Sequence, residues 1–261
     1  MTNLLPLLTR AMCLLAVLFA SRSALVAQSN EPKATHVFIT YRCKPADRPA
    51  FLRLLQEDQL PRLEQWKKDG VMLEYLLLTN QFVDENTWDA TLLLQFERYE
   101  QTARWTAIER DFPGGLGPKL LAVAAPTTTY LADLQLQGGS AGDRSKSIFV
   151  LIPYTWRDKA SYLDFIKVYG LPQFDAWVKE KVVAGYGVFT NHHATGKPWD
   201  AMLVFEYHDI EALGKRDLVK QQVRVGLGKD PAWRLASDAK AELRTELEVV
   251  MAVPVVAKKG S

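Results

Sequence analysis

The chain has 261 residues, of which 48% are hydrophobic, and its 32 lysines and arginines nearly balance 30 aspartates and glutamates. A chain of this length accommodates two compact units of about 100 residues that each bury a core. The balanced charge and the lack of basic blocks argue against a protein that binds nucleic acid.

The first residues predict an export signal. Arg10 precedes an apolar run over 11–20 that is too short to span a bilayer, and small residues lead to a cleavage site after Ala27. We expect a signal peptide over 1–27 and a periplasmic or secreted mature chain without a membrane span; an uncleaved amphipathic anchor is the alternative. Cleavage would remove Arg10 and Arg22 but no acidic residue, so the mature chain would be neutral.

An internal repeat recurs at a spacing of 111 residues. The matching positions are Leu60-Pro61 with Leu171-Pro172, Trp66 with Trp177, Tyr75 with Tyr186, Thr79-Asn80 with Thr190-Asn191, and Trp88-Asp89-Ala90 with Trp199-Asp200-Ala201. The alignment needs no gap between the pair His36 and Ser147 and the pair Glu97 and His208. Such a period indicates one supersecondary unit built twice. We expect the first repeat over 28–136, a linker over 137–146, the second repeat over 147–256 and a tail over 257–261.

Each repeat is predicted to begin with a strand that leads into a helix. The segments 36–41 and 148–152 are rich in β-branched and aromatic residues, which favours strands. Apolar residues over 51–66 and 162–177 recur at helical spacing, which predicts one helix in each repeat.

The boundaries of these two helices carry matching signals. Asp47 and Asp158 stand where an N-cap residue belongs. Pro61 and Pro172 interrupt the apolar pattern, and proline removes a backbone donor and collides with the preceding turn. We therefore expect a kink or a break at each proline.

The remaining elements of each repeat are two strands, a helix, a glycine-rich break and a last strand. The predicted strands are 71–79, 90–96 and 128–134 in the first repeat, and 182–190, 201–207 and 247–253 in the second. The order β-α-β-β-α-β defines the ferredoxin-like unit and an α+β fold. Small residues over 137–142 suit a flexible linker between the two units.

This tandem arrangement resembles the dimeric α/β-barrel superfamily. The opening strand, the helix with Leu-Pro, and the Trp-Asp that enters the third strand are most similar to NIPSNAP-like proteins. The superfamily also includes cofactor-free monooxygenases. The resemblance implies that two four-stranded sheets face each other as a closed α/β barrel, here within one chain, with the helices outside.

Strand alternation separates a face under the helices from a face toward the barrel interior. Thr40, Arg42, Glu74 and Gln95 lie on the interior face of the first repeat, opposite an apolar face opened by glycines in the second. With His193 from a loop of the second repeat, they are the candidate ligand-binding residues of a semi-polar cavity. Exposure to solvent at strand ends is the alternative for Arg42 and Glu74.

The residues that match between repeats point to structure rather than chemistry. The paired tryptophans and tyrosines are expected to pack the core. Asp89 and Asp200 are expected to hold the turn before the third strand. A catalytic role for these carboxylates is the alternative.

Neither a metal nor a cofactor is expected. His192 and His193 have no Cys, Asp or Glu beside them at a recognised ligand spacing. The glycines over 114–117 follow a helix rather than a strand, which argues against a dinucleotide site. Only Cys43 would survive signal cleavage, so core burial rather than a disulfide must stabilise the chain.

The sequence thus predicts an exported barrel that binds a small organic molecule. A cofactor-free oxygenase or isomerase is the first hypothesis and depends on fold analogy. A non-catalytic binding module and a structural or interaction barrel are the alternatives. Assembly into a homo-oligomer stays open.

Overall fold

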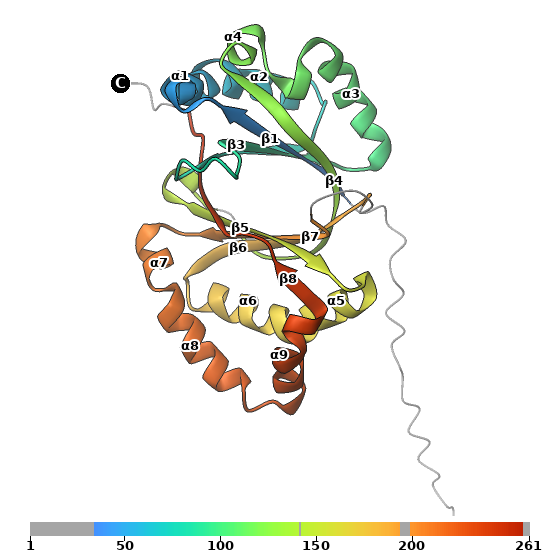
Figure 1. Cartoon of the computed structure of the whole chain (residues 1–261), viewed down its shortest axis with the longest axis vertical. Helices are drawn as coiled ribbons and strands as arrows, with labels where there is room; N and C mark the ends of the chain where they lie inside the picture. The colour runs from blue at the N-terminus through green and yellow to red at the C-terminus, as the bar shows by residue number, and fades with distance from the viewer. Residues whose placement is uncertain (1–33, 141, 194–198, 258–261) are drawn as a thin grey trace, which may run out of the picture. The chain divides into compact units, whose positions relative to one another are not determined.

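A computed structural model describes residues 34–140, 142–193 and 199–257 (Figure 1). The predicted signal peptide and residues 258–261 of the predicted tail lie outside these ranges. The described residues belong to one compact unit, Pro32–Ser261, so the two predicted repeats are not separate bodies. We call 34–140 the first half and 142–257 the second half. Within the described ranges, none of the helices combines the length and apolar composition that crossing a bilayer requires.

Both halves supply four long strands to one antiparallel sheet. The strands of the first half are β1 (Thr35–Cys43), β2 (Glu74–Asn80), β3 (Ala90–Phe96) and β4 (Ala124–Gly139). Those of the second half are β5 (Ile148–Trp156), β6 (Val183–Asn191), β7 (Ala201–Tyr207) and β9 (Val250–Pro254), with a short β8 (Arg244–Glu246) beside β5.

The strand order is the same in the two halves. It runs β4-β1-β3-β2 in the first half and β9-β5-β7-β6 in the second. Strand β4 also pairs with β6, and β2 pairs with β9, so the eight strands form a closed circuit. This pairing agrees with the predicted barrel that closes within one chain.

The alignment of the opening strands without a gap is wrong by two residues. Tyr41 pairs with Ala90, whereas Tyr154 pairs with Ala201, so β1 and β5 are related by a shift of 113 residues. Strands β3 and β7 keep the shift of 111. His36 therefore corresponds to Phe149 rather than to Ser147. The physical reason is a connection to the following helix that is two residues shorter in the second half.

The first helix of each half continues through its proline. In the first half α1 (Arg48–Leu54) and α2 (Leu60–Lys68) are joined by a π-helical turn, Leu55–Gln59. In the second half α5 (Lys159–Phe165) and α6 (Leu171–Lys179) are joined by the turn Ile166–Gly170. Pro61 and Pro172 are the second residues of α2 and α6, one residue beyond these turns. The wider turn accommodates the missing donor and the proline ring, so the predicted interruption is a π-helical turn and not a break.

Only one of the two predicted N-caps forms. Asp158 is extended, and its side chain accepts a hydrogen bond from the Ser161 backbone. Asp47 has helical backbone angles and makes no such bond. The difference arises because a 3-10 turn, Pro45–Asp47, precedes α1, so Asp47 already lies inside the helical path.

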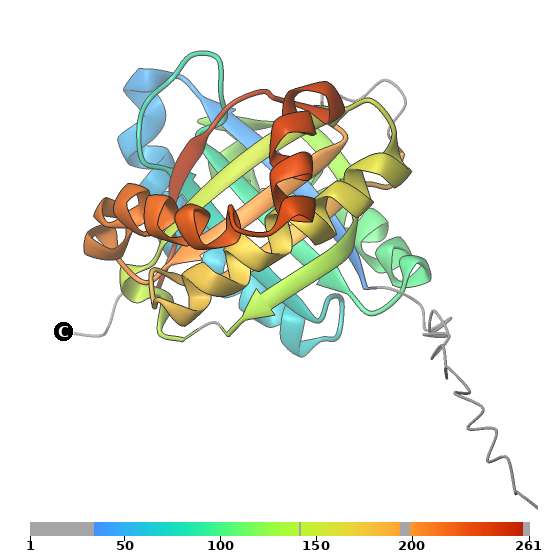
Figure 2. The same cartoon turned by 90° about the horizontal axis from the view of Figure 1, so that it is seen from below.

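The other helices complete the outer layers. The first half adds α3 (Thr102–Asp111) and α4 (Pro118–Leu121), and the second adds α7 (Ile210–Gly214), α8 (Arg216–Leu227) and α9 (Pro231–Leu243). Figures 1 and 2 show helices of the second half covering the outside of their own sheet. The predicted linker differs from the structure at its start, because Gln137–Gly139 belong to β4 and pair with β6.

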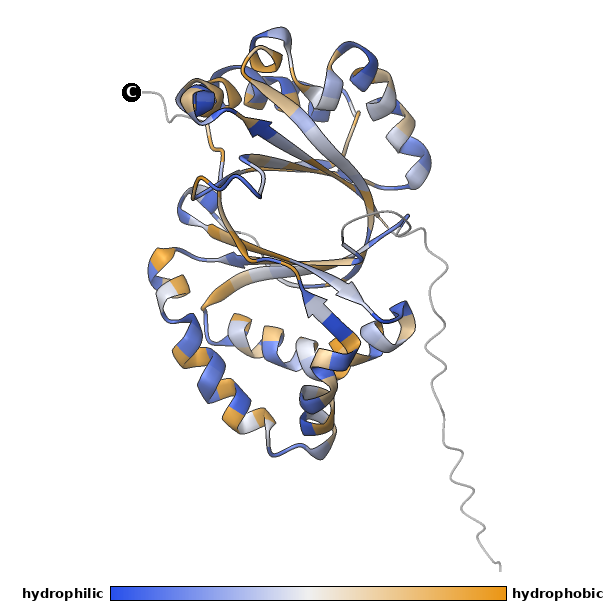
Figure 3. Cartoon of the chain, in the orientation of Figure 1, coloured by the Kyte–Doolittle hydropathy of each residue, from blue (hydrophilic) through white to orange (hydrophobic). Residues whose placement is uncertain are grey.

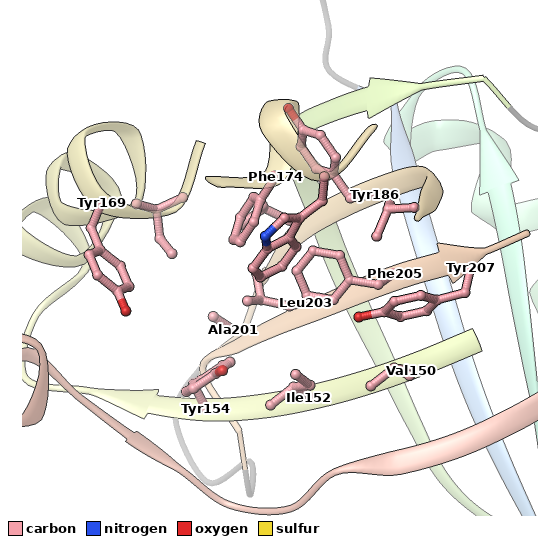
Figure 4. Packing of buried hydrophobic residues seen from close by; sticks show 14 of the residues in the cluster. Val150, Ile152, Tyr154, Tyr169, Phe174, Tyr186, Ala201, Leu203, Phe205 and Tyr207 are labelled. Atoms are coloured by element: carbon pink, nitrogen blue, oxygen red, sulfur yellow. The ribbon is translucent and has the colours of Figure 1, made fainter. Parts of the chain in front are cut away.

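The buried apolar residues form three clusters, two on the outer face of the sheet and one on its inner face. One lies between the helices and sheet of the first half, and a second lies between those of the second half (Figure 4). The third draws on both halves and lies inside the barrel; among its members are Phe38, Leu93, Phe149, Phe189, Trp199 and Val204. Figure 3 shows that much of the sheet is coloured as hydrophobic, in agreement with apolar clusters on both of its faces. The predicted alternation is confirmed, since Leu92 and Leu203 pack under helices while Leu93 and Val204 face inward.

Candidate functional site

A cavity of about 580 Å³ opens at one end of the barrel. It lies where β1 and β5 begin and where β3 and β7 end. We call it the barrel cavity; its lining includes His36, Glu74, Leu93, Gln95, Leu134, Gln137, Arg144, Phe149, Gly185, Gly187, Phe189, Val204 and Glu206. Its volume falls in the range of sites for small organic molecules.

The deeper lining is apolar and comes from both halves. Leu93 and Val204 occupy matching positions on β3 and β7, and both are buried. Phe149 and Phe189 add aromatic surface from β5 and β6. These side chains favour a ligand with an apolar body, because they remove apolar surface from water when the cavity is filled.

The first half contributes a neutral polar pair. His36 and Gln95 are cross-strand partners on β1 and β3. His36 is 6% exposed, and its buried Nδ1 atom has no hydrogen-bond partner among the described residues. Burial lowers the pKa of His36 to about 4, against the opposing effects of a hydrogen bond with the Ala34 backbone and of the Asp133 carboxylate. The imidazole is therefore neutral at pH 7.

The second half contributes a charged group. Glu206 on β7 is 5% exposed and accepts a hydrogen bond from the Ser147 hydroxyl at 2.9 Å. The Arg144 Nε atom donates to its other oxygen at 3.2 Å. The Arg144 guanidinium also lies 6.0 Å from the centre of the Phe149 ring. A buried carboxylate needs such partners, because desolvation of an unpaired charge is costly.

The two polar groups occupy related places in the barrel. Gln95 and Glu206 are equivalent by the shift of 111 residues, and each lies beside the first strand of its half. His36 and Phe149 are equivalent by the shift of 113. The matched positions of the barrel cavity thus carry neutral polar groups in the first half, and Glu206 with an aromatic ring in the second, while Glu74 adds a carboxylate from the first half.

A second hollow of about 540 Å³ adjoins the barrel cavity. We call it the side groove; helix α2, the start of β2 and the segment Pro254–Ala257 line it. Glu74, Tyr75, Leu76 and Arg144 line both hollows.

The side groove lies where the strand pairing between the two halves is short. Strand β9 pairs with β2 only over Leu78–Asn80, whereas β4 pairs with β6 from Ala132 to Gly139. Among the described residues, no strand of the second half therefore pairs with the first three residues of β2.

The structure brings two of the five predicted residues to the barrel cavity. Glu74 and Gln95 line it, but Thr40, Arg42 and His193 do not. Thr40 contacts the hydroxyls of Thr127 and Thr128 near the far end of β1. Both Thr40 and Arg42 lie on the expected strand, but too far along it to reach the cavity.

The positions of Arg42 and His193 explain their absence from the lining. Arg42 donates to the Asp84 carbonyl at 3.5 Å. His193 follows the end of β6 that is distant from Gly185, and its backbone donates to the Asn191 side chain. Its ring packs edge-on against His192 at 4.6 Å.

Four cavity-associated residues were not among the predicted site residues. They are His36, Arg144, Ser147 and Glu206. The alternation of β7 puts Glu206 on the same face as Val204, but the sequence does not show that its side chain is buried. Arg144 and Ser147 stand at the border of the predicted linker, where no periodicity identifies an inward-pointing side chain.

The matched aspartates make structural contacts, but with the ends of the first strands rather than with the turn before the third strand, where they were expected. Asp89 accepts a hydrogen bond from the Cys43 backbone, and Asp200 accepts one from the Trp156 backbone. These carboxylates hold the far ends of β1 and β5 and lie away from the barrel cavity. The buried Trp66 and Trp177 belong to the two outer clusters.

Metal ligands do not gather in the part of the chain that the structure describes. Within it, no group of three His, Cys, Asp or Glu side chains has the spacing to hold a metal ion. Of the described histidines, only His36 is among the residues that line the barrel cavity.

No protein-family model matches this chain, and no curated protein matches it. Solved structures do resemble it. An anthrone oxidase-like protein matches with a TM-score of 0.55 and 11% identity, over 87% of this chain and 93% of that chain. A candidate monooxygenase from Fusobacterium nucleatum matches with a TM-score of 0.52 and 10% identity, over 88% and 96%. A candidate monooxygenase from Lactobacillus acidophilus matches with a TM-score of 0.51 and 13% identity, over 87% and 97%.

These likenesses show a shared fold, the dimeric α/β barrel. Identities of 10–13% carry no residue-level correspondence. The chemistry of this chain therefore has to be argued from its own cavity.

Proposed function

We propose that this barrel binds a small organic molecule with an apolar body in the barrel cavity. The observation that carries the proposal is the barrel cavity itself, where apolar side chains of both halves lie beside the neutral His36 and the paired Glu206 and Arg144. The apolar surface would hold the body of such a molecule, and the polar groups would fix its orientation.

The test uses a probe that matches these features. 2-Naphthol has an apolar body and a single hydroxyl donor, and equilibrium dialysis measures its binding. Val204→Phe extends a ring into the barrel cavity and is expected to weaken binding at least about tenfold by occupying the site. Val225→Phe is the matched control, because Val225 is 68% exposed on α8. Equal binding by both variants would contradict the proposal.

A cofactor-free oxygenase is the second candidate. It is favoured by the same neutral imidazole and by the names of two kinds of structural neighbour, monooxygenase and anthrone oxidase-like. His36 would accept a proton from an acidic C–H or O–H of the substrate, and the resulting anion would react with O₂. Binding carries the stronger argument, since an imidazole with a pKa of about 4 is a weak base at pH 7.

Oxygen uptake with anthrone tests this second candidate. Anthrone and one O₂ give anthraquinone and one water, so uptake and product stand in a ratio of one to one. His36→Phe is expected to abolish uptake, while dialysis still detects anthrone binding. Uptake unchanged in His36→Phe would exclude His36 as the base, and uptake by the parent no faster than without protein would leave binding as the only proposed function.

Three further features belong to the proposal. The chain is a duplicated ferredoxin-like unit, as the shared strand order supports, and NIPSNAP-like proteins are its suggested relatives. Export with cleavage after Ala27 stays a prediction, checked by sequencing the N-terminus of the exported protein. An intact Met1 on that protein would reject cleavage.

A further inference from the structure

Arg144 stands at the junction of the two hollows. It lines the barrel cavity and the side groove, and its side chain is 40% exposed. Its Nε atom is engaged with Glu206. Among the described residues, its two Nη groups have no hydrogen-bond partner.

The surroundings hold Arg144 in this position. Ser147 and the Arg144 Nε atom occupy both oxygens of the buried Glu206, which fixes the carboxylate. The Phe149 ring lies beside the guanidinium at 6.0 Å, an arrangement that favours a cation. A short turn, Arg144–Lys146, capped by Asp143, sets the backbone. The arginine is therefore oriented before a ligand arrives.

We propose that Arg144 binds an oxyanion of the ligand through its Nη groups, so that the occupant of the barrel cavity is an amphipathic organic acid. The inference rests on the proposed function and names its ligand class. A planar guanidinium presents paired donors that match the two oxygens of a carboxylate or sulfonate. The apolar body would lie among Leu93, Phe149 and Phe189, and a longer acid would extend into the side groove.

The nearby acids leave this role open to Arg144. Glu74 lines both hollows but forms an ion pair with Lys67 at 2.7 Å. Glu64 in the side groove accepts a hydrogen bond from the Tyr75 hydroxyl. Glu206 partly neutralises Arg144, but it contacts only the Nε atom of the guanidinium. A cationic ligand would find both Glu206 oxygens already engaged.

The experiment compares an acid with its neutral analogue. 2-Naphthoate and 2-naphthalenemethanol share the same ring system, and isothermal titration at low salt measures both. We expect the full chain to prefer the acid. Arg144→Gln should weaken naphthoate binding about tenfold or more, as the loss of charge-assisted hydrogen bonds does, and change naphthalenemethanol binding less than about twofold. Arg144→Lys should retain part of the preference for the acid, because lysine keeps the positive charge but lacks the paired donors of a guanidinium.

Two further variants keep the test decisive. Arg144→Gln with Glu206→Gln removes both charges, so no carboxylate is left buried without a partner, and it should lose the acid preference equally. Arg42→Gln removes the same charge outside the barrel cavity and should leave the preference intact. Equal binding of acid and alcohol by the parent, or an equal change of both in Arg144→Gln, would overturn the inference while the proposed function stands. Binding of neither probe by the parent would contradict both.

Discussion

The two halves of the barrel agree on their outer faces and differ at the barrel cavity. Under the helices, Trp66 and Trp177 occupy matching places, and Tyr75 and Tyr186 each donate to a carboxylate on the neighbouring helix. At the barrel cavity, the first half presents a neutral histidine where the second half presents Phe149. The fold requires the shared residues, and the unshared ones are free to shape a ligand site.

The largest expected effect tests the shared outer cores. Trp66→Ala and Trp177→Ala should each lower the free energy of unfolding by about 3–5 kcal/mol, because each removes a large buried aromatic side chain. Trp66 packs edge-on against Trp105 at 5.6 Å, and Trp177 packs against Phe205 at 5.6 Å. Urea unfolding measures both. Urea midpoints that barely move would show that these tryptophans do not stabilise the outer clusters.

The second effect tests the difference at the barrel cavity. The pKa of His36 is about 4 in the folded chain, below the value of 6.5 for an unperturbed histidine. Above pH 6.5 His36 is neutral in both the folded and the unfolded chain and does not reduce the free energy of unfolding. As the pH falls from 6.5 toward 4, only the unfolded chain binds a proton at His36, so the free energy of unfolding falls. Lowering the pH from 7 to 5 should cost about 2 kcal/mol through His36 alone.

His36→Phe makes the first half resemble the second and serves as the comparison. Its loss of stability between pH 7 and 5, measured by urea unfolding, should be smaller than that of the parent by this amount. The contributions of the other titrating groups cancel when the pH dependence of the variant is subtracted from that of the parent. Equal pH dependence would mean that His36 is not held neutral by burial.

The third effect tests the buried Glu206 of the second half. Ser147→Ala should cost about 1–2 kcal/mol, because the buried Glu206 loses a hydrogen-bond donor. Ser145→Ala is the matched control in the same loop, since Ser145 is exposed. Thermal unfolding of the two variants side by side measures the difference. Equal stability would indicate that water replaces the Ser147 hydroxyl at no cost.

The smallest expected effect returns to the shared features. Tyr75→Phe and Tyr186→Phe each remove one hydroxyl that donates to a carboxylate, Glu64 or Asp175. Each change should cost about 1 kcal/mol, since the hydrogen bonds lie near the surface. Chemical denaturation should give similar values for both. A large difference between them would show that the outer faces are less alike than their contacts indicate.

The sequence predicted the order of elements and the inward and outward faces of the strands. Its repeat carried that information because Leu92 and Leu203, or Leu93 and Val204, recur at one spacing. The shift between β1 and β5 was missed although its signal was present. A gap of two residues aligns Val37 with Val150, Ile39 with Ile152 and Tyr41 with Tyr154.

The barrel cavity was predicted less completely than the fold. Periodicity shows which face a side chain occupies, and it correctly assigned Glu74 and Gln95. It does not show how far along the barrel a residue lies, which is why Thr40 and Arg42 were expected at the cavity. Arg144 reaches it from a turn after β4, and the local sequence of a turn carries no information about where its side chain points.

The length of β4 has a consequence for how the molecule can be divided. Its 16 residues pair with β1 along one stretch and with β6 along the next, so the first half ends in a strand that completes the sheet of the second. During synthesis from the N-terminus, this strand is finished before β6 exists. Separate fragments covering 28–140 and 142–261 should therefore reassociate into one barrel when they are produced together, each supplying the edge that the other lacks. Co-purification of a tagged first fragment with an untagged second one measures this, and shortening the first fragment to residue 131 should abolish it.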